Sequence, residues 1–287
     1  MLLVGYCFAG CDPGNPPKEN PEPVKENLIF FEDFNTPHLD SSIWNTEVTG
    51  MHVNKELQAY VDSSAVISIV DEGKAEGATG GALLLQPRYT PGLITKDGQA
   101  FDFISGRINT RKKLEFTYGT VAARIKLTAG TGVWPAWWLM GTGDWPASGE
   151  IDIMEYVGEK DCVSAAVHGP GYSGDAGLVN RYYFSKDADA TGWHTYAVDW
   201  SKDSLVFRYD GVAMFRVTKP MTTFFGQWVF DTPKFLVLNF AVGGVYPFKT
   251  NGISSPYFGL PAATVKRIEE GKDKMWVDWV KVTQQTH

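Results

Sequence analysis

Three acidic residues lie close together in one short segment, Glu150-Ile151-Asp152-Ile153-Met154-Glu155, with apolar residues between them. Side chains alternate between the two faces of a strand, so Glu150 and Asp152 share a face. Glu155 follows Glu150 by five positions and would point to the opposite face of a regular strand. A β-bulge adds one residue and restores the parity. We therefore predict a bulge around Ile153-Met154 that brings the three carboxyl groups to one side.

Grouping three carboxyl groups is electrostatically unfavourable, because like charges a few ångströms apart raise the pKa of at least one of them. A site built in this way keeps one carboxyl protonated and another ionised near neutral pH. Retaining glycosidases need such a pair, about 5–5.5 Å apart, as nucleophile and acid/base. Asp152 lies between the two glutamates, where it can form a hydrogen bond to the nucleophile. The acids alone leave two alternatives open, a solvated acidic strand edge and a calcium site.

Four tryptophans lie shortly before this segment in the sequence. Trp134, Trp137 and Trp138 precede it, and Trp145 lies five residues before Glu150. Flat aromatic side chains bind sugars because the C–H faces of pyranose rings stack on them. We expect Trp137 to belong to the core, and alternation then places Trp134 and Trp138 on the other face. These neighbours favour a catalytic role for the acids, directed at a carbohydrate.

From Leu28 onward the chain consists of short apolar or alternating runs bounded by Gly, Pro, Asp and Asn, a pattern typical of β-strands. Only AATVKRIEEG, at 262–271, has helical periodicity. No internal repeat or change of composition divides this region. We therefore predict one all-β domain over residues 28–287, a sandwich or a barrel. The runs are NLIFFEDF, GALLLQPRY, GTVAARIKL, VSAAVHG, HTYAVDW, SLVFRYDG, KFLVLNFAV and MWVDWVKVT.

The charge balance limits the partners. The chain carries 26 Lys and Arg against 33 Asp and Glu, a formal net charge of −7. Binding to nucleic acid needs clustered basic residues, and none are present, so we expect no nucleic-acid partner. No apolar stretch reaches the ~18 residues of a membrane span. Aromatic residues make up 14% of the chain, enough for a large core and a sugar-binding surface together.

The first residues resemble the end of a bacterial lipoprotein signal. The stretch MLLVGYCFAGC is apolar and ends at Ala9-Gly10-Cys11, although it is short and has no basic region before it. We predict a lipid anchor on Cys11 (residues 1–11) and a Pro- and Glu-rich spacer over 12–27. The protein would then lie in the cell envelope, lipid-anchored, or be secreted. The alternative is a disordered apolar terminus, and Cys162 is predicted to be a buried free thiol.

The whole pattern resembles glycoside hydrolase family 16. GEIDIMEYVG, preceded by WPAWWLM and DWPAS, is similar to the longer E-x-D-x-x-E signature of the branch that contains laminarinases. The resemblance covers nearly all of residues 28–284, in the expected order. Its further segments are NKELQAY (54–60), SGRINTRKK (105–113), YGTVAARIKL (118–127), WHTYAVDW (193–200), NFAVGG (239–244) and MWVDWVKV (275–282).

This resemblance implies a jelly roll of two curved antiparallel sheets, with a concave face that forms the substrate cleft. It implies that Glu150 is the nucleophile, Asp152 its supporting acid and Glu155 the acid/base. It also assigns substrate contacts, namely Asn54, Trp134, Trp138, Trp145 and His168, the last on a strand that faces the acids. No cofactor is expected for catalysis, and the protein is expected to be a monomer.

The resemblance further implies a structural Ca²⁺ on the convex side. Its ligands would be the Asp278 side chain, a carbonyl at Asp33 and a carbonyl near Gly81; such oxygen ligands suit this ion. Two segments depart from the family pattern. Tyr246-Pro247-Phe248 stands where relatives have Trp-Pro-Gly, and residues 90–103 look like a loop of individual length at one end of the groove.

The predicted activity is retaining endo-hydrolysis of β-1,3-glucan (laminarin), of mixed-linkage β-1,3/1,4-glucan, or of both. One alternative is a galactan hydrolase of the agarase or carrageenase type, whose sulfated or anhydro-galactan substrates would favour a more basic cleft than the few residues from Arg107 to Lys113 provide. Another is a non-catalytic carbohydrate-binding jelly roll, which has no need of three clustered acids.

Overall fold

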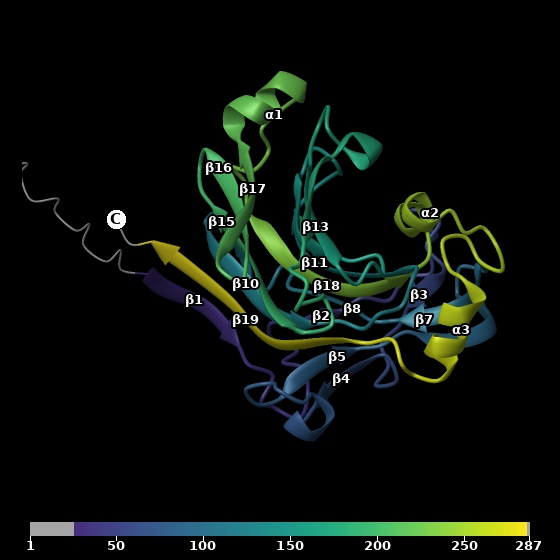
Figure 1. Cartoon of the computed structure of the whole chain (residues 1–287). Helices are drawn as coiled ribbons and strands as arrows, with labels where there is room; N and C mark the ends of the chain where they lie inside the picture. The colour runs from purple at the N-terminus through teal and green to yellow at the C-terminus, as the bar shows by residue number, and fades with distance from the viewer. Residues whose placement is uncertain (1–25, 286–287) are drawn as a thin grey trace, which may run out of the picture.

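The computed structural model describes residues 26–285, and two eight-stranded antiparallel sheets dominate it (Figure 1). The predicted all-β jelly roll of two antiparallel sheets is confirmed. Cys7, Cys11 and the predicted lipid anchor lie outside the described residues. Strand β1 begins at Glu26, two residues before the predicted start of the domain. Within the described range, no helix combines the length and the hydrophobicity needed to cross a bilayer.

Sheet A follows the order β17-β16-β15-β10-β19-β5-β4, and β1 also pairs with β19. β-Branched and aromatic residues are frequent in its long central strands, and the β10–β19 pairing shifts register once, between Arg124 and Ile125. The last strand pairs with β1, so both ends of the described chain meet in this sheet. The strands are β17 (Val212–Thr218), β16 (Ser204–Tyr209), β15 (Trp193–Trp200), β10 (Gly119–Lys126), β19 (Met275–Gln285), β5 (Ala82–Leu85), β4 (Ile67–Val70) and β1 (Glu26–Glu32).

Sheet B follows the order β14-β13-β12-β11-β18-β8-β2, and β9 pairs with β18. The acidic segment is β12, an inner strand between β11 and β13. An inner strand has ladder partners on both sides, so its backbone is fixed in register. The strands are β14 (Leu178–Tyr183), β13 (Cys162–His168), β12 (Glu150–Glu155), β11 (Val133–Gly141), β18 (Lys234–Val242), β8 (Arg107–Asn109), β2 (Asn45–Thr46) and β9 (Glu115–Phe116).

The core lies between the two sheets. Leu139, Ile151, Val198 and Leu236 are fully buried members of one continuous apolar cluster. Trp137 is also fully buried in it, as predicted, and Cys162 is a buried free thiol, as predicted. The face of sheet B that points away from this core carries the acids.

A third, three-stranded sheet and three short helices complete the fold (Figure 1). Residues 90–103, expected to be a loop, form most of a hairpin instead, because the turn at Thr95–Gln99 closes with backbone hydrogen bonds. The helix expected at 262–271 is present, whereas two other helices were not foreseen. The elements are β3 (Gln58–Tyr60), β7 (Ala100–Ser105), β6 (Arg88–Ile94), α1 (Lys219–Phe225), α2 (Val245–Asn251), α3 (Ala262–Glu269) and two 3₁₀ turns, η1 (Glu72–Lys74) and η2 (Gly174–Ala176).

Candidate active site

A β-bulge lies in β12 at the predicted place. On one side, Trp138 pairs with Asp152 and Trp137 with Met154, so Ile153 is extra. The register with β13 shifts over the same residues. Ile153 and Met154 are both fully buried, so two consecutive side chains point into the core. Because the parity changes there, Glu155 returns to the face of Glu150 and Asp152, and the predicted bulge is confirmed.

The register places a defined neighbour beside each acid. Glu150 lies opposite His168 of β13, and Asp152 lies opposite Trp138 of β11. Glu155 pairs with Ala136 on one side and with Ser164 on the other. Two of the predicted neighbours, Trp138 and His168, therefore come from the two flanking strands.

Asp152 is the most buried of the three acids, 4% exposed. Burial raises the pKa of Asp152 well above its ordinary value, and the carboxylates of Glu150 and Glu155 raise it further. Asp152 thus holds its proton more tightly than an ordinary aspartate, and in the protonated form it can donate a hydrogen bond to Glu150. Its Oδ2 lies 3.4 Å from Nε2 of His168. Burial lowers the pKa of His168 against the opposing effect of Glu150, which favours the neutral imidazole.

Glu155 has the properties of an acid/base. Burial raises the pKa of Glu155 to about 7; a hydrogen bond from Trp134 opposes the shift and the charge of Glu150 adds to it. The Nε1 of Trp134 donates to Oε1 of Glu155 over 2.9 Å. Tyr246 of α2 packs edge-on against Trp134 with ring centroids 5.5 Å apart. A carboxyl with this pKa is a good proton donor and acceptor near pH 7.

The other two tryptophans lie on the same face. The Nε1 of Trp138 donates to Oδ1 of Asn239 over 2.7 Å, and the guanidinium of Arg107 lies 4.9 Å from the centroid of its ring. Trp145 is 46% exposed, and its ring centroid lies 6.3 Å from that of His168. Aromatic surfaces therefore flank the acids toward β11 and toward the turn before β12.

Asn54 lies in a turn before β3, outside sheet B. It is exposed, with a left-handed backbone (φ 52°), and its side chain donates to Glu56. Its carbonyl accepts from the backbone N–H of Val245, next to Tyr246. Asn54 thus supports the start of α2, and no described hydrogen bond joins it to Glu150, Asp152 or Glu155.

Sequence reasoning did not single out the polar network beside Trp138. Asn239 accepts from Trp138, and its Nδ2 donates to the hydroxyl of Tyr60 over 3.1 Å. Arg107 pairs with Glu47 over 3.0 Å. The NFAVGG and SGRINTRKK segments contained the signal, because a polar side chain on a buried strand needs a hydrogen-bond partner beside it.

The side chain of Asp278, the only side-chain ligand of the predicted calcium site, does not fit an ion in this arrangement. Asp278 is fully buried, and its Oδ1 accepts from the N–H and the hydroxyl of Thr79. Its Oδ2 accepts from Arg124. Both oxygens therefore have donors, and the guanidinium already supplies the positive charge. Near Asp33 and Gly81, the side chain of Asn35 accepts from the N–H of Gly81 over 2.7 Å.

Another group could hold a metal by geometry alone. Glu150, Asp152 and His168 offer ligand atoms within 4.8 Å of one another. The raised pKa of Asp152 disfavours an ion there, because metal ligands must be deprotonated.

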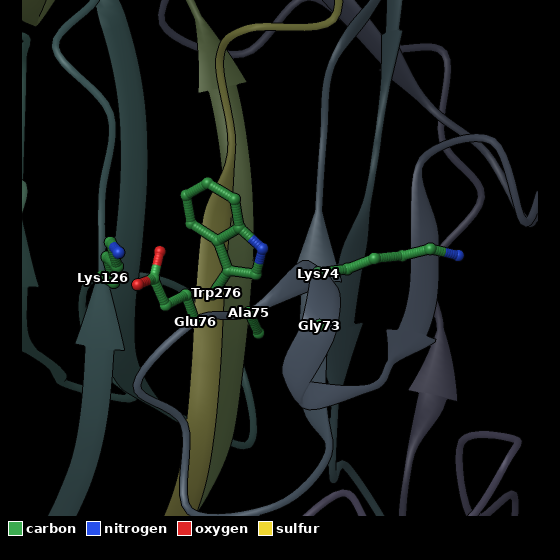
Figure 2. Close-up of a pocket in the computed structure, with 6 residues that line it drawn as sticks. All are labelled: Gly73, Lys74, Ala75, Glu76, Lys126 and Trp276. Atoms are coloured by element: carbon green, nitrogen blue, oxygen red, sulfur yellow. The ribbon is translucent and has the colours of Figure 1, made fainter.

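A small pocket of about 240 Å³ lies elsewhere, between η1 and the outer side of sheet A (Figure 2). Lys126 and Trp276, on neighbouring strands, line it together with Glu76 and the short segment Gly73–Ala75. Trp276 also packs against a small apolar cluster that includes Ala75 and is separate from the main core. This pocket contains none of the acids of β12.

A bulged inner strand that presents two glutamates and an aspartate of raised pKa beside tryptophans, on a two-sheet β-sandwich, is the arrangement of a glycoside hydrolase. The chain matches the model of the family Glycosyl hydrolases family 16 over residues 41–252. It belongs to this family.

The relatives agree with that assignment. The chain is 31% identical to Beta-glucanase of Rhodothermus marinus, over 85% of this chain and 83% of that protein. It is 33% identical to Glucan endo-1,3-beta-glucosidase A1 of Niallia circulans over 76% of this chain, but it spans only 34% of that longer protein. The structure of endo-beta-1,3-glucanase from Pyrococcus furiosus superposes with a TM-score of 0.77, at 30% identity, over 92% of this chain and 96% of that one.

Proposed function

We propose that this glycoside hydrolase cleaves β-1,3-glucan, or mixed-linkage β-1,3/1,4-glucan, internally and with retention of the anomeric configuration. The observation that carries the proposal is the bulge in β12, which presents Glu150 and Glu155 on one face. Of these two carboxyls, Glu155 has its pKa raised to about 7.

In the first step, Glu155 donates its proton to the glycosidic oxygen while a carboxylate oxygen of Glu150 attacks the anomeric carbon. The bond to the leaving sugar breaks and a covalent glycosyl ester forms on Glu150. In the second step, the ionised Glu155 takes a proton from water, the water oxygen attacks the same carbon, and Glu150 departs as a carboxylate. Two inversions give net retention.

Asp152 and Trp134 adjust the two glutamates for these steps. The pKa of Asp152 is raised, so this carboxyl can hold a proton and donate it in a hydrogen bond to the Glu150 carboxylate as that group departs from the ester. The N–H of Trp134 stabilises the ionised form of Glu155, which is the form required as base in the second step. Each glutamate thus has a neighbour suited to its role.

The proposed substrate follows from the relatives and the aromatic face. The Niallia and Pyrococcus proteins are named as 1,3-β-glucan hydrolases. Trp134, Trp138 and Trp145 offer neutral stacking surfaces that suit glucose rings better than sulfated sugars. Laminarin and mixed-linkage glucan both contain β-1,3-linked glucose, whereas cellulose does not.

The test is a product profile on laminarin, barley β-glucan, cellulose, agarose and carrageenan. We expect short oligosaccharides from one or both of the first two, and NMR of the first products should show the β-anomer. Glu150→Gln is the control for contaminating activity. Cleavage of agarose or carrageenan without cleavage of either glucan would refute the substrate assignment; an α-anomer as first product would refute the mechanism.

We also propose, from the Ala9-Gly10-Cys11 sequence, that a lipid on Cys11 anchors a monomeric protein in the cell envelope. Replacement of Cys11 by Ser in the native host should release the protein into the soluble fraction. Sedimentation of the released protein should give the mass of one chain. Equal membrane association with and without Cys11 would contradict the anchor.

A further inference from the structure

A tyrosine of the opposite sheet reaches the bulge through the core. Tyr209, at the end of β16 in sheet A, is fully buried. Its hydroxyl lies 2.7 Å from the carbonyl oxygen of Ile153 and 3.0 Å from that of Ser164. Ile153 is the extra residue of the bulge, and Ser164 is the β13 partner of Glu155. One phenol thus joins the two strands where their register shifts.

The ring of Tyr209 packs against two other tyrosines in the core. Tyr196 packs edge-on against it at 4.9 Å between ring centroids, and Tyr182 does the same at 5.4 Å. Burial raises the pKa of Tyr209 well above its ordinary value, so the hydroxyl keeps its proton and acts as a donor. A buried hydroxyl is unfavourable unless it is hydrogen-bonded, and here both acceptors belong to sheet B, which carries the acids.

We propose that Tyr209 is a positioning residue for the hydrolytic reaction. Its hydroxyl shares one proton between the carbonyl oxygens of Ile153 and Ser164, and so fixes the bulge that places Glu155 on the same face as Glu150. The inference rests on the proposed roles of these two glutamates. Glu155 directly follows the two bulged residues, so its place depends on their backbone. Bulges bend a strand and loosen its ladder, and a displacement of about 1 Å can lower turnover on the order of a hundredfold.

The variant Tyr209→Phe removes only the hydroxyl. We expect kcat/KM on a laminari-oligosaccharide to fall about tenfold to a hundredfold, because a misplaced acid loses part of the gain from general acid catalysis. The loss should lie in kcat, with KM little changed. On an aryl laminaribioside with a 2,4-dinitrophenolate leaving group, which departs without protonation, kcat/KM should stay within about twofold of wild type.

Tyr196→Phe is the matched control. Tyr196 is equally buried and touches the same ring, but its hydroxyl has no hydrogen-bond partner among the described residues. Removing it makes the same chemical change without touching the bulge. Its kinetics should match wild type on both substrates.

A merely structural role predicts a different result, namely equal losses on the natural and the activated substrate, and this result would overturn the proposal. Wild-type kinetics for Tyr209→Phe on both substrates would overturn it as well. If the variant is partly unfolded, all three proteins are compared in trimethylamine N-oxide, which favours the compact state. A wild type that cleaves no glucan would instead refute the proposed function, so the two failures are distinguishable.

Discussion

Glu155→Gln should inactivate the enzyme and, at the same time, stabilise its fold in a pH-dependent way. The pKa of Glu155 is raised from an ordinary value of 4.5 to about 7, first by burial and then by Glu150. Ionisation of Glu155 therefore costs more free energy in the folded protein than in the unfolded chain. Glutamine has almost the same shape, carries no charge and keeps a carbonyl oxygen that accepts from Nε1 of Trp134.

The sign and size follow from proton linkage. Below pH 4.5 both the folded and the unfolded protein hold the proton on Glu155, so ionisation costs nothing. Between pH 4.5 and about 7 the unfolded chain releases its proton while the folded protein keeps it, so the free energy of unfolding falls as the pH rises. A shift of this size corresponds to about 3 kcal/mol above pH 7. The variant Glu155→Gln has no carboxyl to ionise, so its free energy of unfolding does not fall in this way. Its gain in stability over wild type should therefore grow as the pH rises from 4.5 to about 7.

Urea denaturation of wild type and Glu155→Gln at pH 4.5, 6 and 8 measures the difference. We expect the gain of the variant to be greater at pH 8 than at pH 4.5 by about 3 kcal/mol. Glu270→Gln is a control of opposite sign, because the hydrogen bond from Lys272 lowers the pKa of Glu270; its variant should lose stability as the pH rises. A gain for Glu155→Gln that is independent of pH, or a loss at pH 8, would refute the reasoning.

Three further predictions concern neighbouring groups. Glu150→Ala with azide should form the α-glycosyl azide, seen by NMR, and a β-azide would mean that the two glutamates have exchanged roles. Trp134→Phe removes the hydrogen bond that lowers the pKa of Glu155, so the alkaline limb of kcat/KM against pH should move above about 7; no shift would contradict this. Because Arg124 already neutralises Asp278, EDTA should leave the thermal midpoint unchanged while Arg124→Met lowers it, and a large drop with EDTA would restore the calcium prediction.

The strands and the bulge were predictable because they depend on local alternation. A run such as KFLVLNFAV is consistent with a buried strand wherever it lies, and the structure has β18 at Lys234–Val242. The bulge followed from parity once the two glutamates, five positions apart, were assigned to one face. Even the single helix with clear periodicity, at Ala262–Glu269, was predictable.

The partners across the sheets were not predictable from this one sequence. Tyr209 and Ile153 are separated by 56 positions, and Arg124 and Asp278 by 154. Nothing in a local pattern says which side chain meets another over such distances. The resemblance placed Asp278 in a calcium site, but the arginine that pairs with it lies in a segment with an ordinary strand pattern. The helices α1 and α2 have seven residues each, too few for a periodic signal.

One face of β12 destabilises the fold and the other stabilises it, and the bulge allows one short strand to have both. On the outer face, burial and mutual repulsion raise the pKa of Asp152 and Glu155, which destabilises the ionised fold. On the inner face, Ile151, Ile153 and Met154 are fully buried, and each contributes roughly 1.5–3 kcal/mol. A regular strand of six residues would give three side chains to each face, but Glu155 would then be an inner one. The extra residue keeps three apolar side chains inside and all three acids outside, so the strand retains the hydrophobic stabilisation that offsets its charged face.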